Sequence, residues 1–449
     1  MRSILVLAII ALGFAGSVVS RQIGLLTYIW FALFRPLEWM WWDMRSFRLS
    51  LVAGLLFLVP CIFTGWMPNV TNPMSLLSLS FLGTVLVAHF TSYLQSSFGW
   101  VDQFIRLLVV CMLAVNLVDS KKKLSQVVAV MAGSFAFFAA KAGLFYYIDG
   151  GVQFSAGQAG AFIDNNGYAM AVNMAIPLMA ATALALQVDV PYLKYLRYSF
   201  LLCIPFSIMT VIGTMSRAGL LSLGSLVLSA GMLQRRPFLW TGGMVLAGAL
   251  MFTVVPLPQG YLDRMQTIQT YEEVGEGSAL SRFHFWHIAT VMVARNPYGV
   301  GLRRFDDAYD DHDDSAGYWG SHRSVHNSHL EVLAEMGYAG FAIWIVMFIY
   351  AFVLCLRVRY GAASLAGLSE DDRKFYITMA NAFMASMFAF IIGGTFIASA
   401  NNELTWLTFF VVAILHRLYR KDVDALKPVP VAADRVAAVV PRPRRQAIA

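Results

Sequence analysis

A succession of long apolar runs separated by short polar turns limits most strongly how this chain can fold. Such runs lie near residues 49–63, 76–94, 104–118, 127–147, 167–186, 200–215, 220–233, 238–255, 340–356, 375–399 and 404–415. A helix of about 20 apolar residues crosses a bilayer, and a helix bonds its own backbone there. Together with residues 1–34, the pattern predicts an all-α polytopic membrane protein with about 12 transmembrane helices, give or take one.

Composition supports this fold class. Of the 449 residues, 58% are hydrophobic and only 13% are charged, whereas a soluble protein has about a quarter of its residues charged. This excludes a water-soluble enzyme. The net charge of +7 is typical of Lys and Arg kept on the cytoplasmic side of a membrane, and we expect no nucleic-acid partner.

The first 34 residues leave two topologies open. Apolar stretches at residues 4–18 and 23–34 follow one another closely. They form either one uncleaved span or a short hairpin of two helices, since a cleaved signal peptide has no second apolar run directly after it.

Basic clusters predict the orientation of the bundle. They fall on one side of the expected topology, which is therefore cytoplasmic; they comprise Lys121–Lys123, Arg235 with Arg236, Arg357 with Arg359, and Arg417 with Arg420 and Lys421. We expect four parts: a transmembrane bundle over 1–255, an external catalytic loop over 256–329, transmembrane helices over 330–421, and a disordered cytoplasmic tail over 422–449.

The external loop concentrates groups that can perform chemistry. Six of the eight histidines lie in it or at its exit, namely His284, His287, His312, His322, His326 and His329. A loop of this length is far longer than a connector requires, and such loops commonly carry function. We expect His326, just before the next span, at the outer mouth of the bundle.

Two arginines are further candidates. Arg217 follows Ser216 where one span ends and the next begins, and Arg282 starts an expected helix over 281–294. An arginine near the bilayer edge either extends to lipid headgroups or grips a phosphate through its planar fork. Lys141, inside an apolar run, is a weaker candidate for substrate binding.

Metal and nucleotide sites are not expected. His322, His326 and His329 have spacings that would suit zinc on a helix, but no HExxH, CxxC, GxGxxG or GxxxxGK[ST] motif is present. The acidic run over 306–314 lacks EF-hand spacing. We expect it to be solvated and mobile, with loose binding of cations or acceptor as the alternative.

An ordered series of short motifs resembles the O-antigen ligase and polymerase superfamily. The series comprises Ser216-Arg217-Ala218-Gly219, Ser281-Arg282, Asn296-Pro297, Gly299-Val300-Gly301, His326-Asn327, Glu335 and Gly337. Further matches at residues 141–145, 162–166 and especially 263–273 are similar to the O-glycosylation ligases associated with exosortase A systems. The acidic run at 306–314 departs from the family pattern, so acceptor specificity carries over least.

The resemblance implies a glycosyltransferase of the C type in the bacterial inner membrane, with its active site facing the periplasm. Such an enzyme moves a glycan from undecaprenyl diphosphate to an acceptor hydroxyl of a protein or glycan. By resemblance, His326 activates the acceptor and Arg217 and Arg282 hold the diphosphate. Asn166, Asn327 and Ser216 are expected to orient substrate or histidine. No cofactor is expected, because the lipid diphosphate is already a good leaving group.

Two alternatives remain open at this stage. A polysaccharide polymerase would use the same chemistry with a second lipid-linked glycan as acceptor. A lipid-linked glycan transporter would move substrate without bond exchange, but transporters place functional charges near the midplane in related halves, and no internal repeat is evident in this chain.

Overall fold

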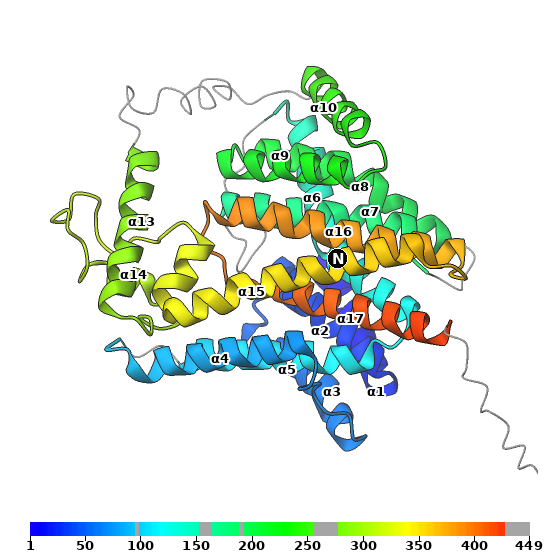
Figure 1. The fold of residues 1–449 in the computed structure, drawn as a ribbon, viewed down its shortest axis with the longest axis horizontal. Coiled ribbons are helices and arrows are strands. Elements are labelled where there is room, and N and C mark those ends of the chain that lie inside the picture. The colour runs from blue at the N-terminus through cyan, green and yellow to red at the C-terminus, as the bar shows by residue number, and fades with distance from the viewer. Residues whose placement is uncertain (95–97, 152–163, 188–192, 255–276, 427–449) are drawn as a thin grey trace, which may run out of the picture.

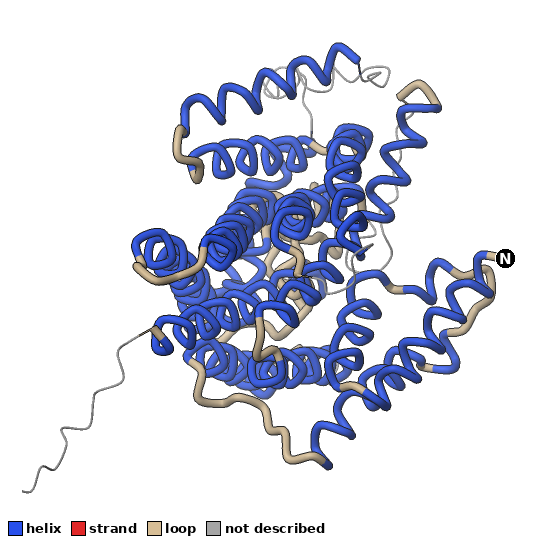
Figure 2. Tube along the Cα trace, turned by 90° about the vertical axis from the view of Figure 1, so that its right-hand side faces the viewer, coloured by secondary structure: helices blue, strands red, loops and turns tan. Residues whose placement is uncertain are grey.

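The computed structural model describes residues 1–94, 98–151, 164–187, 193–254 and 277–426, and the regular elements in these ranges are helices (Figures 1 and 2). In chain order they are α1 (Arg2–Val19), α2 (Arg21–Phe34), the 3-10 turns η1 (Pro36–Trp39) and η2 (Arg45–Phe47), α3 (Leu49–Phe63), α4 (Pro73–Thr91), α5 (Phe98–Leu117), α6 (Lys121–Ile148), α7 (Asn165–Ala185), α8 (Leu193–Gly213), α9 (Arg217–Met232), α10 (Pro237–Val254), α13 (Gly277–Arg295), α14 (Phe305–Tyr309), α15 (Ser328–Ser364), α16 (Glu370–Gly394) and α17 (Glu403–Ala425).

The length and composition of these helices confirm the polytopic fold. Among the described residues, eight helices are long and apolar enough to cross a membrane, namely α1, α4, α5, α6, α7, α8, α15 and α16. Shorter apolar helices occur at α3, at α9 and over most of α10. The predicted apolar runs therefore became helices, and the chain is a multi-pass membrane protein.

Residues 1–34 fold as a hairpin of two helices. α1 ends at Val19 and α2 begins at Arg21. The two helices pack closely at Gly16 of α1, because a Cβ on this glycine would lie only 2.8 Å from the Cγ2 atom of Ile23 on α2. The chain then returns to its starting end, because the Arg2 guanidinium lies 4.5 Å from the Trp41 ring centroid. Of the two topologies left open by the sequence, the structure has the two-helix form.

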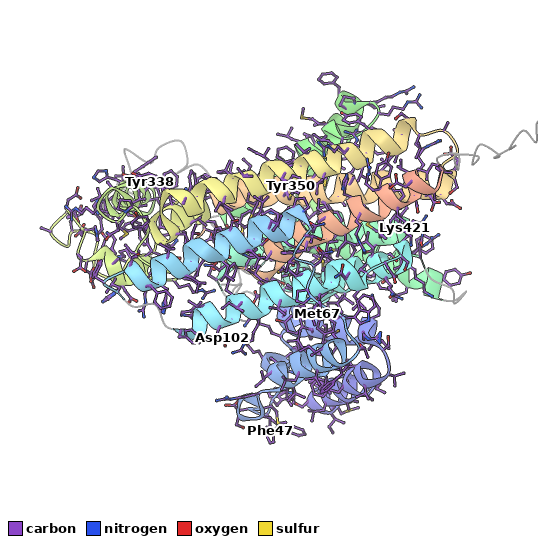
Figure 3. The ribbon with its side chains drawn as sticks, turned by 60° about the horizontal axis from the view of Figure 1, so that its bottom comes forward. Phe47, Met67, Asp102, Tyr338, Tyr350 and Lys421 are labelled. Carbon is purple, nitrogen blue, oxygen red and sulfur yellow. The ribbon has the colours of Figure 1, made fainter. Side chains whose placement is uncertain are left out.

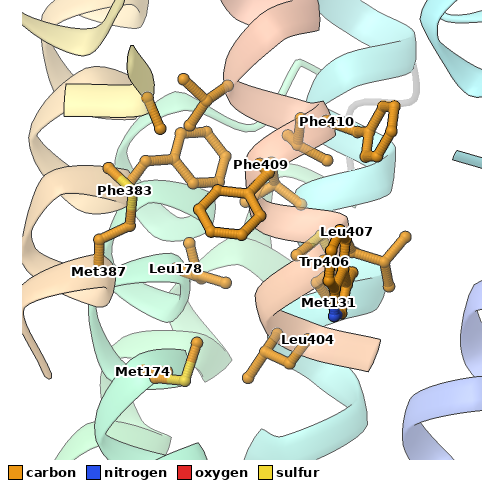
Figure 4. Close-up of a cluster of buried hydrophobic side chains, with 14 of the residues drawn as sticks. Met131, Met174, Leu178, Phe383, Met387, Leu404, Trp406, Leu407, Phe409 and Phe410 are labelled. Carbon is orange, nitrogen blue, oxygen red and sulfur yellow. The ribbon is translucent and has the colours of Figure 1, made fainter. Parts of the chain in front are cut away.

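The core lies where α6, α7, α16 and α17 meet (Figure 4). Trp406 of α17 is fully buried, and its ring centroid lies 4.7 Å from that of Phe104 and 5.2 Å from that of Phe81. The first half of α17 is buried on all sides. Because close packing of large side chains in a protein interior tolerates little change in volume, this cluster gives the bundle a rigid centre.

The two ends of the bundle differ in charge, and Figure 3 shows Tyr338 and Lys421 toward opposite ends. At the end near Lys421, the Lys121 Nζ lies 2.9 Å from Asp422 Oδ2, and Arg417 donates to the carbonyl oxygen of Val118 at 2.7 Å. We call this end the basic end. The opposite end, where α13 and α14 lie (Figure 1), is the loop end.

The C-terminal boundary needs one correction. The tail was expected to be disordered from residue 422, but α17 continues to Ala425. Its last turns are held by the Asp422 carboxylate, which also accepts a hydrogen bond of 2.7 Å from the Tyr376 hydroxyl. Residues 427–449, the remainder of the predicted tail, and residues 255–276, the start of the predicted loop, lie outside the described residues.

Candidate functional site

The loop end is built on a small apolar cluster of its own. α13 begins at Gly277, before the expected Ser281, and ends at Arg295 just before Asn296-Pro297, as predicted. One face of α13 packs against α14 and the segment before α15, with a core formed by Phe285, Ile288, Ala289, Met292, Val300, Phe305, Ala308, Tyr309, Val325 and Ala334. This cluster turns the external segment into an ordered platform.

A turn over residues 297–301 packs closely against a kink in α15. Gly337 interrupts the helix with φ of 70°, and a Cβ there would lie 2.1 Å from the carbonyl oxygen of Pro297. Gly299, with φ of 93°, would in turn place a Cβ 2.2 Å from the Glu335 carbonyl oxygen. Only glycine fits this left-handed, closely packed crossing, which explains the spacing of the two glycine motifs in physical terms.

Two buried carboxylates hold the first turns of α15 in place. Glu335 accepts backbone hydrogen bonds from Arg303 at 2.8 Å and from Phe305 at 3.2 Å. Glu331 accepts one from Ala400 at 2.9 Å. Sequence reasoning assigned no role to Glu331, although two carboxylates one turn apart at the start of an apolar helix are a signal for such buried anchoring.

His326 lies between a buried residue and a helix-capping residue. Val325 before it is fully buried, and Asn327 after it caps α15 by accepting from the backbone N–H of His329 at 2.9 Å and of Leu330 at 3.1 Å. His326 itself has φ of 47°, a left-handed conformation that is costly for a residue with a Cβ and is typical of functional sites. The imidazole lies beside Phe285 of α13, with ring centroids 6.3 Å apart.

Arg217 occupies the first turn of α9 at the same end of the bundle. Ser216 caps this helix by accepting from the Gly219 N–H at 2.9 Å, and the same hydroxyl donates to Asn166 Oδ1 at 2.7 Å. Gly219 lets α9 approach α7 closely, because a Cβ there would lie 2.6 Å from that of Ala169. The start of α9 is thereby fixed against the start of α7.

Electrostatic interactions link the three residues that were expected to be catalytic. Burial and then the positive charge of Arg217 lower the pKa of Arg282. Burial and then the charge of Arg282 lower the pKa of His326, with Arg323 lowering it further and Asp164 raising it. Although His326 is exposed to solvent, its lowered pKa favours the neutral imidazole at pH 7. Asp164, which caps α7, is a site neighbour to which sequence reasoning gave no role.

This arrangement can bind an anion and accept a proton. Two guanidinium groups form charge-assisted hydrogen bonds to phosphate oxygens, and a neutral imidazole is a base near physiological pH. Residues 201–345, which contain all three side chains, match the family model described as O-antigen ligase. Residues 201–345 are thus similar to the O-antigen ligase and polymerase superfamily, and we call them the ligase domain. No curated protein sequence matches the chain.

Four residues expected to bind substrate have different surroundings, and their role in binding stays a prediction. Lys141 is exposed on α6, where its ammonium lies 5.9 Å from the Phe145 ring centroid one turn away. Asn327 is 5% exposed and its side-chain oxygen is engaged in capping, so its contacts are those of a helix cap. Asn166 and Ser216 lie together beside Arg217. The expected motif at 263–273, and residues 162–163 of another, lie outside the described residues.

Other histidines of the ligase domain have structural partners. His329 accepts from the Trp344 Nε1–H at 3.1 Å and its Nε2 lies 3.1 Å from the carbonyl oxygen of Ile391. Both ring nitrogens of His329 are thus engaged inside the bundle by Trp344 and Ile391. His312 is also buried, with Nδ1 lying 2.8 Å from the Ala308 carbonyl oxygen.

The acidic run is more ordered than expected. Asp306, Asp307, Asp310, Asp311 and Asp314 are exposed, but Asp313 is not. Its Oδ1 lies 2.8 Å from His284 Nε2. Burial alone would raise the pKa of Asp313, yet hydrogen bonds from Ser315, Gly317 and His284 hold it well below its usual range. The acidic run is therefore held against α13 through the contact of Asp313 with His284.

His284, Asp313 and Asp314 are also the described residues that come nearest to a set of metal ligands. Their ligand atoms all lie within 4.8 Å of one another. Asp313 is already bonded through both oxygens, to the Ser315 hydroxyl at 2.8 Å and to the Gly317 N–H at 2.8 Å. These hydrogen bonds hold the Asp313 carboxylate in place beside His284.

Proposed function

We propose that this chain transfers a glycan from undecaprenyl diphosphate to an acceptor hydroxyl at the periplasmic face of the bacterial inner membrane. The observation that carries the proposal is that the charge of Arg217 acts on Arg282 and the charge of Arg282 acts on His326, within a segment that matches O-antigen ligase. An anion clamp beside a neutral base is what transfer from a lipid diphosphate requires.

The arginines act on the leaving group. As the bond between the anomeric carbon and the diphosphate oxygen breaks, negative charge grows on the diphosphate, and Arg217 and Arg282 are placed to stabilise it. A well-placed donor to a developing anion lowers the activation barrier by about 3–4 kcal/mol. The electrostatic cost of holding two guanidinium groups close together is offset once the diphosphate binds between them.

His326 acts on the acceptor. Its imidazole takes the proton of the acceptor hydroxyl as the oxygen forms a bond to the anomeric carbon. Attack from the side opposite the diphosphate inverts the configuration at that carbon. The lowered pKa of His326 keeps the imidazole unprotonated at pH 7, and bound diphosphate, by offsetting the arginine charges, strengthens it as a base when the donor is present.

The orientation follows from charge. Lys121, Arg359 and Arg417 lie at the basic end, which the distribution of Lys and Arg in membrane proteins assigns to the cytoplasm. The loop end then faces the periplasm, where lipid-linked glycans and an acceptor protein or glycan meet.

The test is transfer by purified protein with a lipid-diphosphate-linked glycan as donor. His326→Ala should abolish transfer while the protein still inserts and binds donor. His287→Ala is the matched control, because His287 is an exposed histidine on α13 that pairs with the exposed Asp314. Equal loss in both variants would contradict a specific role for His326.

A polymerase that uses the same residues is the alternative within the superfamily. Single transfer of a preassembled glycan gives one product length, whereas polymerisation gives a ladder of lengthening chains. A transporter is disfavoured because the candidate charges gather at one end of the bundle rather than at its midplane.

A further inference from the structure

A cavity opens at the loop end, and Arg217, Arg282 and His326 are not among the residues that line it. It has a volume of about 950 Å³ and is lined by α2, α3, α5 and the segments at 302–303 and 401–403. We call it the α2–α5 cavity. One part of its wall is apolar and includes Leu51, Leu55 and Leu58 of α3 with Leu107 of α5. Its size suits a drug-sized or larger organic ligand.

Positive charge predominates around this cavity. Arg35, Arg48, Arg106 and Arg303 line it, against Glu38 and Glu403. The Arg35 Nη2 lies 3.1 Å from Glu403 and its Nη1 lies 3.9 Å from Glu38. Arg106 pairs with Asp102 of its own helix, so the four guanidinium groups and three carboxylates leave a surplus of one positive charge at the α2–α5 cavity.

Three residues that line the cavity carry buried polar atoms without a hydrogen-bond partner among the described residues. These atoms are both side-chain polar atoms of Asn401, the Arg35 Nε and the Glu403 Oε2. Buried polar groups are nearly always hydrogen-bonded, and each exception asks for an explanation. A ligand with oxygen acceptors and hydroxyl donors would complete the bonds of Asn401 and Arg35.

The backbone presents three of these arginines in a strained conformation. Arg35, Arg48 and Arg303 have φ of 51°, 45° and 54°, in the left-handed region that is unfavourable for a residue with a Cβ. The Arg303 guanidinium is placed over the Trp100 ring at 4.0 Å from its centroid. Strain of this kind persists where the surrounding structure enforces it, commonly at ligand sites.

The cavity also leads toward the candidate site. Arg303 and Asn401 line a smaller polar cavity of about 210 Å³ as well, whose wall includes Ser324 and Val325. These two residues directly precede His326. The α2–α5 cavity therefore adjoins a polar cavity that reaches the segment before His326.

We propose that the α2–α5 cavity binds a second, phosphate-bearing lipid, with its acyl chains against the leucines of α3 and α5 and its phosphate among Arg35, Arg48, Arg106 and Arg303. The apolar wall favours a lipid over a free anion, and the surplus positive charge favours a phosphate over an uncharged lipid. This inference stands apart from the proposed function, because it concerns binding by residues other than those of the transfer site.

The experiment measures equilibrium binding to the purified full chain in detergent. Three probes separate the parts of the ligand: dioctanoyl phosphatidic acid, dioctanoylglycerol, which lacks the phosphate, and inorganic phosphate, which lacks the chains. We expect saturable binding of the phosphatidic acid at least tenfold tighter than of either other probe. Equal affinity for dioctanoylglycerol, or for inorganic phosphate, would overturn the proposal.

Variants locate the site. Arg48→Gln with Arg303→Gln should weaken phosphatidic acid binding at least tenfold, since both side chains are exposed and can be replaced without opening the core. Leu55→Trp, which fills the cavity without changing charge, should weaken it as well. Arg295→Gln, at an exposed arginine at the end of α13, should bind as the unmodified protein does. Unchanged binding in the Arg48/Arg303 variant would refute the assignment whatever the outcome for glycan transfer.

Discussion

The Ser216 hydroxyl donates a hydrogen bond of 2.7 Å to Asn166 Oδ1 and, through the same oxygen, accepts from the Gly219 N–H at 2.9 Å. One hydroxyl therefore caps α9 and ties it to the start of α7. Since Arg217 is the next residue, the direction of its guanidinium depends on this pair of bonds.

Ser216→Ala should reduce glycan transfer and lower stability by about 1 kcal/mol, the usual cost of losing a helix cap. Ser225→Ala is the control on the same helix, because the Ser225 hydroxyl bonds only within its own turn, to the Ser222 carbonyl oxygen. Transfer rate and thermal unfolding in detergent measure the two effects. A variant at Ser216 as active as that at Ser225 would show that the cap does not position Arg217.

Arg217→Lys should lose most transfer although it keeps the charge, because one ammonium cannot form the paired hydrogen bonds of a guanidinium to a diphosphate. The loss should appear in kcat more than in KM, since the bonds strengthen as the leaving group becomes charged. Arg295→Lys, at an exposed position on α13, should leave both constants unchanged. Full kcat in Arg217→Lys would argue against the clamp.

The pH dependence of transfer should report the charge of Arg282. The pKa of His326 is lowered by burial and by Arg282, and transfer needs the neutral imidazole. The acid limb of kcat/KM should therefore lie below the ordinary histidine value of about 6.5. Arg282→Gln removes one lowering charge, so its acid limb should move to higher pH, whereas Arg282→Lys should keep it nearer to the original position. An acid limb that does not move in Arg282→Gln would show that the charge of Arg282 does not affect the pKa of His326.

Gly337→Ala should destabilise the loop end, because alanine must take φ of 70° and its Cβ would meet the Pro297 carbonyl oxygen at 2.1 Å. Strain and overpacking of this kind each cost about 1–3 kcal/mol. Gly83→Ala on α4, where nothing lies within 4 Å of an added Cβ, should be neutral or stabilising. Thermal unfolding of both variants measures the difference, and equal stability would show that the turn over 297–301 yields without cost.

The sequence was most informative where its signal is periodic and local. Apolar runs predicted the helices, and the basic clusters predicted the basic end, because hydropathy and charge act residue by residue. The hairpin at residues 1–34 stayed ambiguous, since its form depends on the close contact of Gly16 with Ile23, which hydropathy does not encode.

Site residues were predicted less evenly. Arg217, Arg282 and His326 stood out because charged or titratable groups are scarce near membrane spans. Lys141 stood out for the same reason; it is exposed on α6, and its role in substrate binding stays a prediction. The anchoring of Arg303 by Glu335 and the pairing of His284 with Asp313 join residues far apart in the chain, and only the folded loop end brings them together.

His326→Ala tests the central claim most directly, with purified protein and a lipid-diphosphate-linked glycan. The account predicts that donor still binds, because Arg217 and Arg282 remain, and that transfer to the acceptor falls to background while the donor accumulates. Transfer at the rate of the unmodified protein would contradict the account, since no group would then be left to take the acceptor proton at this site.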